Sequence, residues 1–95
     1  MQAEALLEAL LVLARETGLA VRRVGAAAAG EGIAPTASAL CRVRGELWVV
    51  LVDSDPAPRR AAVLARGLRV HAPQQLEGRY LPPAVRACLE AAPET

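Results

Sequence analysis

Few residues of this chain have side chains that could carry out chemistry. The sequence contains two cysteines, Cys41 and Cys88, and one histidine, His71. These three could supply metal ligands in principle, but none lies in the CxxC or HxxxH spacing that is typical of zinc sites. Two carboxylates, Asp53 and Asp55, flank a predicted helix start, where capping and the helix dipole account for them. The sequence therefore predicts no catalytic residue, no metal site and no cofactor.

The cysteines also bear on the compartment. Two cysteines are too few for a disulfide framework, and we expect Cys41 to be a buried, inert thiol in a strand. The N-terminal segment carries Glu4 and Glu8 and lacks the basic start of a signal peptide. The longest apolar runs, such as residues 47–52, are far shorter than the roughly 20 residues of a membrane span. These features predict a cytoplasmic protein that does not enter a membrane.

All eleven basic residues are arginines, and the net charge is +1. Eight of them could line the predicted sheet and the predicted long helix: Arg22, Arg23, Arg42, Arg44, Arg59, Arg60, Arg66 and Arg69. A nucleic-acid-binding surface is therefore one alternative. Ten acidic residues balance the arginines, and no aromatic side chains are interleaved for base stacking. A nucleic-acid partner is not expected.

The hydrophobic pattern predicts one α+β domain over residues 1–95, with a three-stranded antiparallel sheet and three helices. Residues 3–17 have the apolar spacing of a helix, which Gly18 ends. Residues 19–24 form a short strand, whose two arginines suit a sheet edge. Residues 25–37 form an irregular connection, which lacks the GxGxxG and GK[ST] motifs of phosphate-binding loops.

The second half of the chain begins with a predicted hairpin. Residues 38–44 and 46–53 form its strands, and Gly45 supplies the positive φ that a two-residue turn needs. A helix follows from Pro56 to about residue 69. Residues 71–79 are predicted to be a loop. The last helix begins near Pro83, with Val85, Cys88, Leu89 and Ala92 on one face, and ends at Pro93.

Side chains alternate along the predicted hairpin, so its two faces can be assigned from the sequence. One face carries Cys41, Val43, Trp48, Val50 and Val52. The other carries Leu40, Arg42, Arg44, Leu47, Val49 and Leu51. We expect the helix after the hairpin to cover the Trp48 face with its main apolar stripe. The second strip of that helix, Val63–Gly67–Val70, should receive the last helix closely through Val85 and Leu89.

The face that carries Val49 is then left as the predicted interaction surface, for a second copy of the chain or for another protein. Its apolar side chains favour burial, and the stems of its arginines could frame the patch. The competing arrangement is internal: the N-terminal helix could cover this face and leave a monomer.

The order helix, strand, hairpin, helix resembles the ImmA/IrrE-type zinc peptidase family, in which a sequence like LAHELGH follows the hairpin. The matching stretch here is LARGLRV, residues 64–70. The resemblance implies that Arg66 and Val70 replace the two zinc-binding histidines and that Gly67 replaces the general-base glutamate. Arginine stays protonated and cannot donate a lone pair to zinc. The resemblance therefore implies a degenerate member that lacks the zinc motif and the hydrolytic activity.

The absence of recognisable chemistry and the excess of apolar surface favour a non-catalytic protein-interaction or regulatory module. Two alternatives stay open at this point. One is a small nucleic-acid-binding regulator that uses the arginine-rich faces. The other is an enzyme of unidentified type, which would need a pocket lined by titratable groups.

Overall fold

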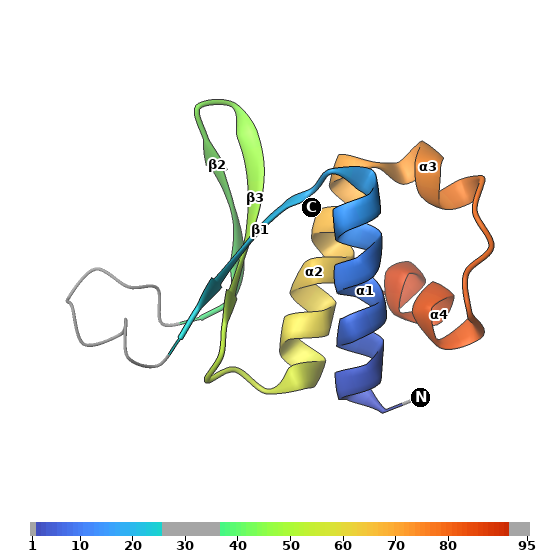
Figure 1. Cartoon of the computed structure of the whole chain (residues 1–95), viewed down its shortest axis with the longest axis horizontal. Coiled ribbons are helices and arrows are strands. Elements are labelled where there is room, and N and C mark those ends of the chain that lie inside the picture. The colour runs from blue at the N-terminus through green and yellow to red at the C-terminus, as the bar shows by residue number, and fades with distance from the viewer. Residues whose placement is uncertain (1, 26–36, 92–95) are drawn as a thin grey trace.

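A computed structural model describes residues 2–25 and 37–91, so most of the predicted connection at residues 25–37 lies outside the described residues, as does Pro93. Figure 1 shows an α+β arrangement, which confirms the predicted class. The elements are α1 (Ala3–Thr17), β1 (Ala20–Val24), β2 (Ala39–Val43), β3 (Glu46–Val52), α2 (Ala57–His71), α3 (Pro73–Glu77) and α4 (Pro83–Ala91). The described ranges thus contain four helices, where three were predicted.

The first helix forms where its apolar spacing placed it. Leu7, Leu10 and Leu13 are buried, whereas Val12 is 47% exposed among the polar positions. Gly18 has a φ of 78°, a left-handed conformation that glycine adopts without a steric penalty. The chain therefore leaves the helix at Gly18 and enters β1.

The sheet is mixed, and the prediction of an all-antiparallel sheet is wrong. The strand order is β1-β3-β2: β1 runs parallel to β3, with Val21 beside Val49, and β2 runs antiparallel to β3, with Leu40 beside Val49. The most apolar strand, β3, takes the central position, where both of its edges are paired. The strand that contains Arg22 and Arg23 lies at a sheet edge, as its arginines predicted.

The hairpin turn consists of Arg44 and Gly45. Their φ angles are 54° and 81°, and Val43 pairs with Glu46 across the turn. Positive φ at both central residues is the pattern of the turns that suit the twist of a two-residue hairpin. This turn fixes which side chains share a face, and the two predicted sets are correct as sets.

The helices, however, cover the opposite face from the one predicted. A Cβ added at Gly67 of α2 would lie 2.5 Å from Cγ2 of Val49 and 3.2 Å from Cδ2 of Leu40. The strip of α2 that contains Gly67 therefore packs on the Val49 face of the sheet, not on α4. The main stripe of α2, which includes Leu64 and Leu68, is turned by roughly 60–100° from Gly67 around the helix. It lies toward α1 and α4, and the predicted packing of this stripe on the Trp48 face is wrong.

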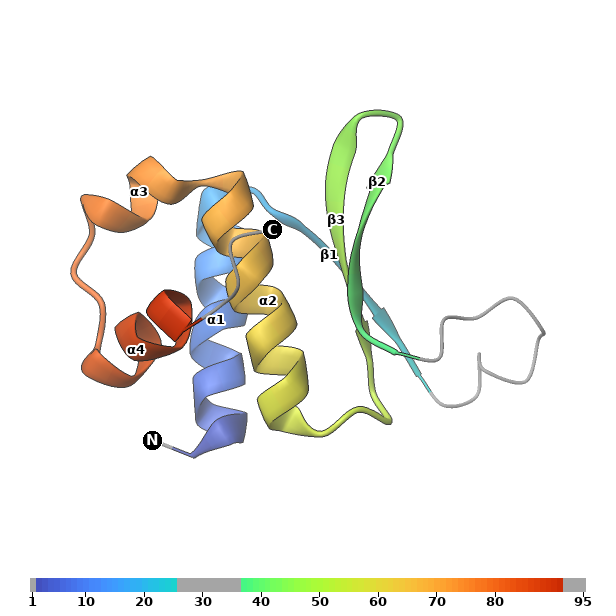
Figure 2. The ribbon, with the colours of Figure 1, turned by 180° about the vertical axis from the view of Figure 1, so that it is seen from behind.

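The segment predicted to be a loop at residues 71–79 contains the short helix α3. Pro73 occupies its start, where a missing N–H costs nothing, and Leu76 is buried. One apolar residue in one turn gives no periodicity that could be detected in the sequence. The following helix, α4, buries Val85 and Leu89 as predicted. It packs on α1 and α2 on the side away from the sheet, as Figures 1 and 2 show.

The described elements thus form three layers: the sheet, the pair α1 and α2, and then α4 with α3. One apolar core runs through them, with its largest fully buried side chains being Leu10, Leu51, Leu64, Leu68, Val49 and Val85. Within the described ranges, no helix has the length and hydropathy needed to cross a membrane.

Candidate functional site

The six residues predicted to form the interaction surface lie on the side of the sheet that the helices cover. Val49 is 0% exposed and Leu51 is 1% exposed. Leu40 and Leu47 are partly buried and pack against the same core. Helix α2 covers most of this face, and α1 contacts β1 beside it. These four apolar side chains are therefore part of the core, and the placement of this face on the outside is wrong.

The two arginines of the predicted set have a different environment. Arg42 and Arg44 are exposed at the end of the hairpin, and Nη1 of Arg42 donates to the carbonyl oxygen of Gly45 at 3.4 Å. Arg44 lies in the turn, and Arg42 lines a shallow hollow with Val70 and His71 at the end of α2. These two members of the predicted surface are thus accessible.

The opposite side of the sheet has no described helix on it, as both views of the ribbon show. We call this side the open sheet face and define it by Cys41, Val43, Trp48 and Val50. Val43 is 51% exposed, Cys41 is exposed, and Trp48 and Val50 are half-buried. Cys41 lies directly across from Trp48 in the register of β2 and β3. A contiguous apolar surface therefore crosses both strands of the hairpin.

The exposure of Cys41 corrects the prediction of a buried thiol. That prediction assumed that a helix covers the Trp48 face. Cys88 in α4 is half-buried, and burial raises the pKa of its thiol. Within residues 2–25 and 37–91, no three His, Cys, Asp or Glu side chains gather in a group that could hold a metal ion.

The arginines do not form one basic surface. Arg22 and Arg23 are consecutive in β1, so their side chains point to opposite faces of the sheet. Nη2 of Arg23 lies 3.8 Å from Oδ1 of Asp53. On the long helix, Arg59 lies 3.7 Å from a carboxylate oxygen of Asp55, at the start of the helix. The described arginines are thus distributed over several surfaces and are partly neutralised.

Two arginines of α2 are instead involved in packing. Nη1 of Arg69 donates to the carbonyl oxygen of Leu89 at 3.1 Å, near the end of α4. Nε of Arg66 is buried and has no hydrogen-bond partner. Neither environment resembles a solvated row of phosphate-binding arginines.

Asp55 does not cap α2, although it precedes the helix. Its Oδ2 accepts a hydrogen bond of 2.6 Å from the backbone N–H of Ser38, and Pro56 is the N-cap residue. The hydroxyl of Ser38 in turn accepts a bond of 2.9 Å from the N–H of Val52. The bonds from Ser38, followed by the charges of Arg59 and Arg60, hold the pKa of Asp55 below its usual value. Together, the bonds between Asp55, Ser38 and Val52 join the start of β2 to the end of β3. This geometry indicates a structural role.

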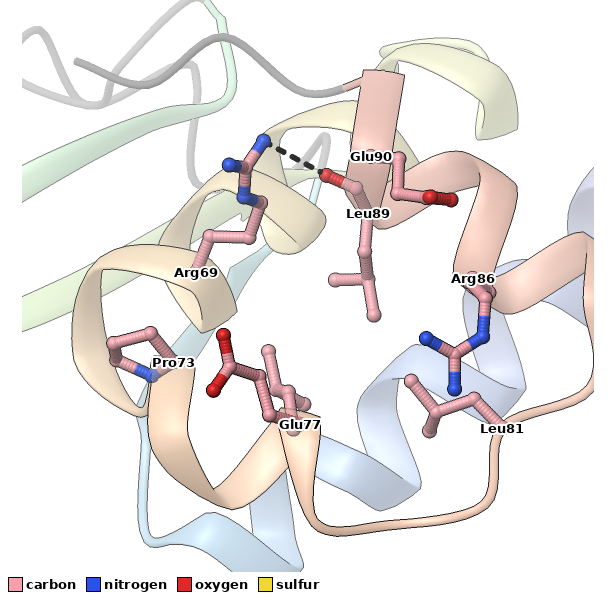
Figure 3. Close-up of a pocket in the computed structure, with 8 residues that line it drawn as sticks. Arg69, Pro73, Glu77, Leu81, Arg86, Leu89 and Glu90 are labelled. Carbon is pink, nitrogen blue, oxygen red and sulfur yellow. Dashed lines mark hydrogen bonds between the residues drawn. The ribbon is translucent and has the colours of Figure 1, made fainter.

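A hollow lies between α3 and α4, as Figure 3 shows. Leu76, Leu81 and Leu89 supply its apolar lining, and the remaining lining residues are Arg69, Pro73, Glu77, Arg86 and Glu90. Its volume of about 220 Å³ is below the range of roughly 300–1,000 Å³ that is usual for ligand pockets. This hollow could not be predicted from the sequence, because residues 71–79 have the pattern of a loop.

The stretch that resembles a zinc-peptidase motif lies in α2, where it packs against the sheet. Gly67 stands at the position of the general-base glutamate, and any side chain there would meet Val49 of the sheet. Val70 is 40% exposed. The adjacent His71 is exposed, and its Nε2 lies 3.0 Å from the carbonyl oxygen of Thr17. His71 thus contacts the end of α1.

Comparison with known proteins adds no further information: no family model, no curated protein and no solved structure matches this chain.

Proposed function

We propose that this chain is a non-catalytic protein-interaction module that binds its partner through the open sheet face. The observation that carries the proposal is the one-sided sheet. The described helices all lie on one side, and Trp48, Val50, Cys41 and Val43 form an apolar surface on the other. Sheets with one uncovered face usually present polar side chains there, so an apolar uncovered face suits a binding surface.

The composition of the open sheet face supports this role. Tryptophan contributes more to binding energy than most other residues in protein interfaces, particularly near the interface centre. Trp48 belongs to the central strand, with Cys41 on one side of it and Ala20 on the other. Arg22 and Glu46 lie at the margins of this face and are exposed. An apolar centre with a charged margin is the arrangement that interfaces commonly have.

The proposal includes the resemblance to the ImmA/IrrE-type family, as a degenerate relative without hydrolytic activity. Two features support it. The elements α1, β1, the hairpin and α2 follow in the order that the resemblance implies. Gly67 occupies the place of the general base, and a side chain there would collide with Val49.

Affinity capture with matched variants tests the proposed surface. The tagged chain is incubated with native lysate to which an untagged copy is added, and retained proteins are identified by mass spectrometry. We expect Trp48→Ala and Val43→Glu to lose at least one protein that the unmodified chain retains. Val12→Glu serves as the control, because Val12 is similarly exposed but lies on α1. Circular dichroism of each variant confirms that it folds.

Two results would contradict the proposal. One is retention of the same proteins by the unmodified chain and both open-face variants. The other is that the unmodified chain retains neither a lysate protein nor its own copy.

A further inference from the structure

We propose that two copies of this chain pair antiparallel along the outer edges of their β2 strands and form one continuous six-stranded sheet. The inference goes beyond the proposed function, because the second copy binds the edge of β2 and leaves the open sheet face accessible. In this arrangement Cys41 lies directly opposite the partner's Cys41. The two open sheet faces then join into one surface.

The outer edge of β2 has the hydrogen-bonding groups that such pairing needs. Among the described residues, β2 pairs only with β3. Residues of an antiparallel pair alternate between exchanging both hydrogen bonds and exchanging none. The two-residue turn makes Val43 and Glu46 a bonded pair, so Cys41 and Ala39 also bond toward β3. Leu40 and Arg42 therefore direct their N–H and C=O groups outward.

The edge has few of the features that usually prevent pairing: only its short length and the charge of Arg42 act against it. Natural edge strands are protected by short length, charged side chains (lysine above all), proline, bulges or a covering element. Residues 39–43 contain no proline and no lysine, and their register with β3 is uninterrupted. Four of the five residues are exposed. The strand is thus a suitable template for another strand.

Charge at the two ends of β2 favours an antiparallel second copy. The carboxylate of Asp55 is held at the start of the strand by its bond from the N–H of Ser38. The positive side chain of Arg44 lies just after the end of the strand. Antiparallel pairing brings Arg44 of each copy beside the partner's Ser38 and Asp55, where it joins Arg59 around the Asp55 carboxylate. Parallel pairing would bring like charges together.

The number of paired residues and the positions of the charges also select the register. Pairing Leu40 with the partner's Arg42 uses all five strand residues, exchanges four hydrogen bonds and puts Cys41 on the twofold axis. A shift by two residues in one direction places Arg42 opposite the partner's Arg42, and like charges directly opposite are unfavourable. A shift in the other direction leaves only three strand residues paired.

Disulfide cross-linking through the natural thiol of Cys41 tests the proposed register. Cys41 and the partner's Cys41 form a non-bonded pair, in which Cα atoms lie about 4.5 Å apart. A disulfide spans Cα separations of about 4.4–6.8 Å. Cys88→Ser leaves Cys41 as the only thiol. Diamide takes up two electrons and two protons as the two thiols form a disulfide, and we expect a cross-linked dimer on denaturing gels.

A thiol at position 43 provides the matched control. Val43→Cys in a Cys41→Ser, Cys88→Ser background places an exposed thiol on the same strand and face. In the proposed register it lies opposite the partner's Ala39, far from its own copy. We expect it to cross-link at least tenfold more slowly than Cys41. Equal rates would indicate random collision and would overturn the register.

A second pair of variants tests whether the dimer depends on the backbone hydrogen bonds of β2. Arg42→Pro removes an outward N–H, which is tolerated at a solvent-facing edge, whereas Arg42→Ala keeps it. Light scattering coupled to size exclusion should give a dimer for the unmodified chain and Arg42→Ala, and a monomer for Arg42→Pro.

Two results would overturn the inference. One is a monomer at high micromolar concentration without Cys41 cross-linking. The other is a dimer that persists in Arg42→Pro. If either occurred while Trp48→Ala still abolished capture of a different protein, the second-copy inference alone would fail and the proposed function would stand.

Discussion

At the scale of single residues, Asp55 shows how one side chain can connect two strands. Its carboxylate binds the N–H of Ser38, and the Ser38 hydroxyl binds the N–H of Val52. Ser38 is buried, so its backbone and hydroxyl groups need partners inside the protein. The sequence Asp-Pro suggested a helix cap, but the polar groups at the start of the hairpin use the carboxylate instead.

This bond makes stability depend on pH in a predictable direction. The pKa of Asp55 is lowered in the folded state, so the unfolded chain binds the proton first as the pH falls. The stabilisation by Asp55 is therefore complete above the usual aspartate pKa of about 4 and is lost as the pH falls through the lowered pKa. We expect Asp55→Asn to reduce the free energy of unfolding at pH 7, and the difference from the unmodified chain to shrink toward pH 3. Urea unfolding at both pH values measures it.

The neighbouring Asp53 supplies a control for that measurement. Asp53→Asn removes an exposed carboxylate whose described contact is an ion pair with exposed Arg23. Exposed pairs contribute little to stability. If Asp53→Asn and Asp55→Asn changed the pH dependence equally, the bond to Ser38 would not be its source.

At the scale of the elements, Gly67 determines how α2 lies on the sheet. Because it has no side chain, the helix backbone approaches Val49 of the central strand closely. Leu64 and Leu68, on the adjacent side of α2, are then free to pack toward α1 and α4. One glycine thus lets a single helix contribute to two layers of the core.

Substitution of Gly67 by alanine is expected to destabilise the fold, although alanine is the better helix former. The gain in helix propensity is about 1 kcal/mol, whereas overpacking a core costs about 1–3 kcal/mol. The Cβ would lie 2.5 Å from Val49, whose branched side chain has little freedom. We expect a net loss of up to about 2 kcal/mol in urea unfolding, and a larger loss for Gly67→Leu.

A second substitution shows whether the close contact is the cause. In a Val49→Ala background the space next to position 67 opens, so Gly67→Ala should there stabilise the protein by up to about 1 kcal/mol. Equal effects of Gly67→Ala in both backgrounds would show that the two positions do not interact.

Some features of these elements follow from local sequence signals, whereas others depend on long-range packing. Local signals were sufficient for α1 with its terminal Gly18, for the hairpin around Gly45, and for the apolar face of α4. The covered face of the sheet could not be derived, because residues 47–52 are apolar on both faces and only the tertiary position of Gly67 distinguishes them. The parallel pairing of β1 depends on which hairpin edge it joins, which is a long-range choice. The apolar character of the open sheet face was recognised, but its exposure was not.

At the scale of the whole molecule, the described elements form three layers, with both helical layers on one side of the sheet. The core is continuous from Leu51 in the sheet through Leu64 in α2 to Val85 in α4. Since β3 contacts α2 and α2 contacts α4, the sheet and the outermost helix share one packed interior. Small domains with one such core usually unfold in a single transition.

The single tryptophan makes this cooperativity measurable. Trp48 lies on the open sheet face, with α1 and α2 between it and α4. We expect urea unfolding followed by Trp48 fluorescence to coincide with unfolding followed by helical circular dichroism. Val85→Ala removes buried methyl groups from α4 and should lower stability by about 1–3 kcal/mol in both signals. A shift of the helical signal without a shift of the fluorescence would mean that α4 unfolds separately, and the sheet would then present the open face without support from the outer layer.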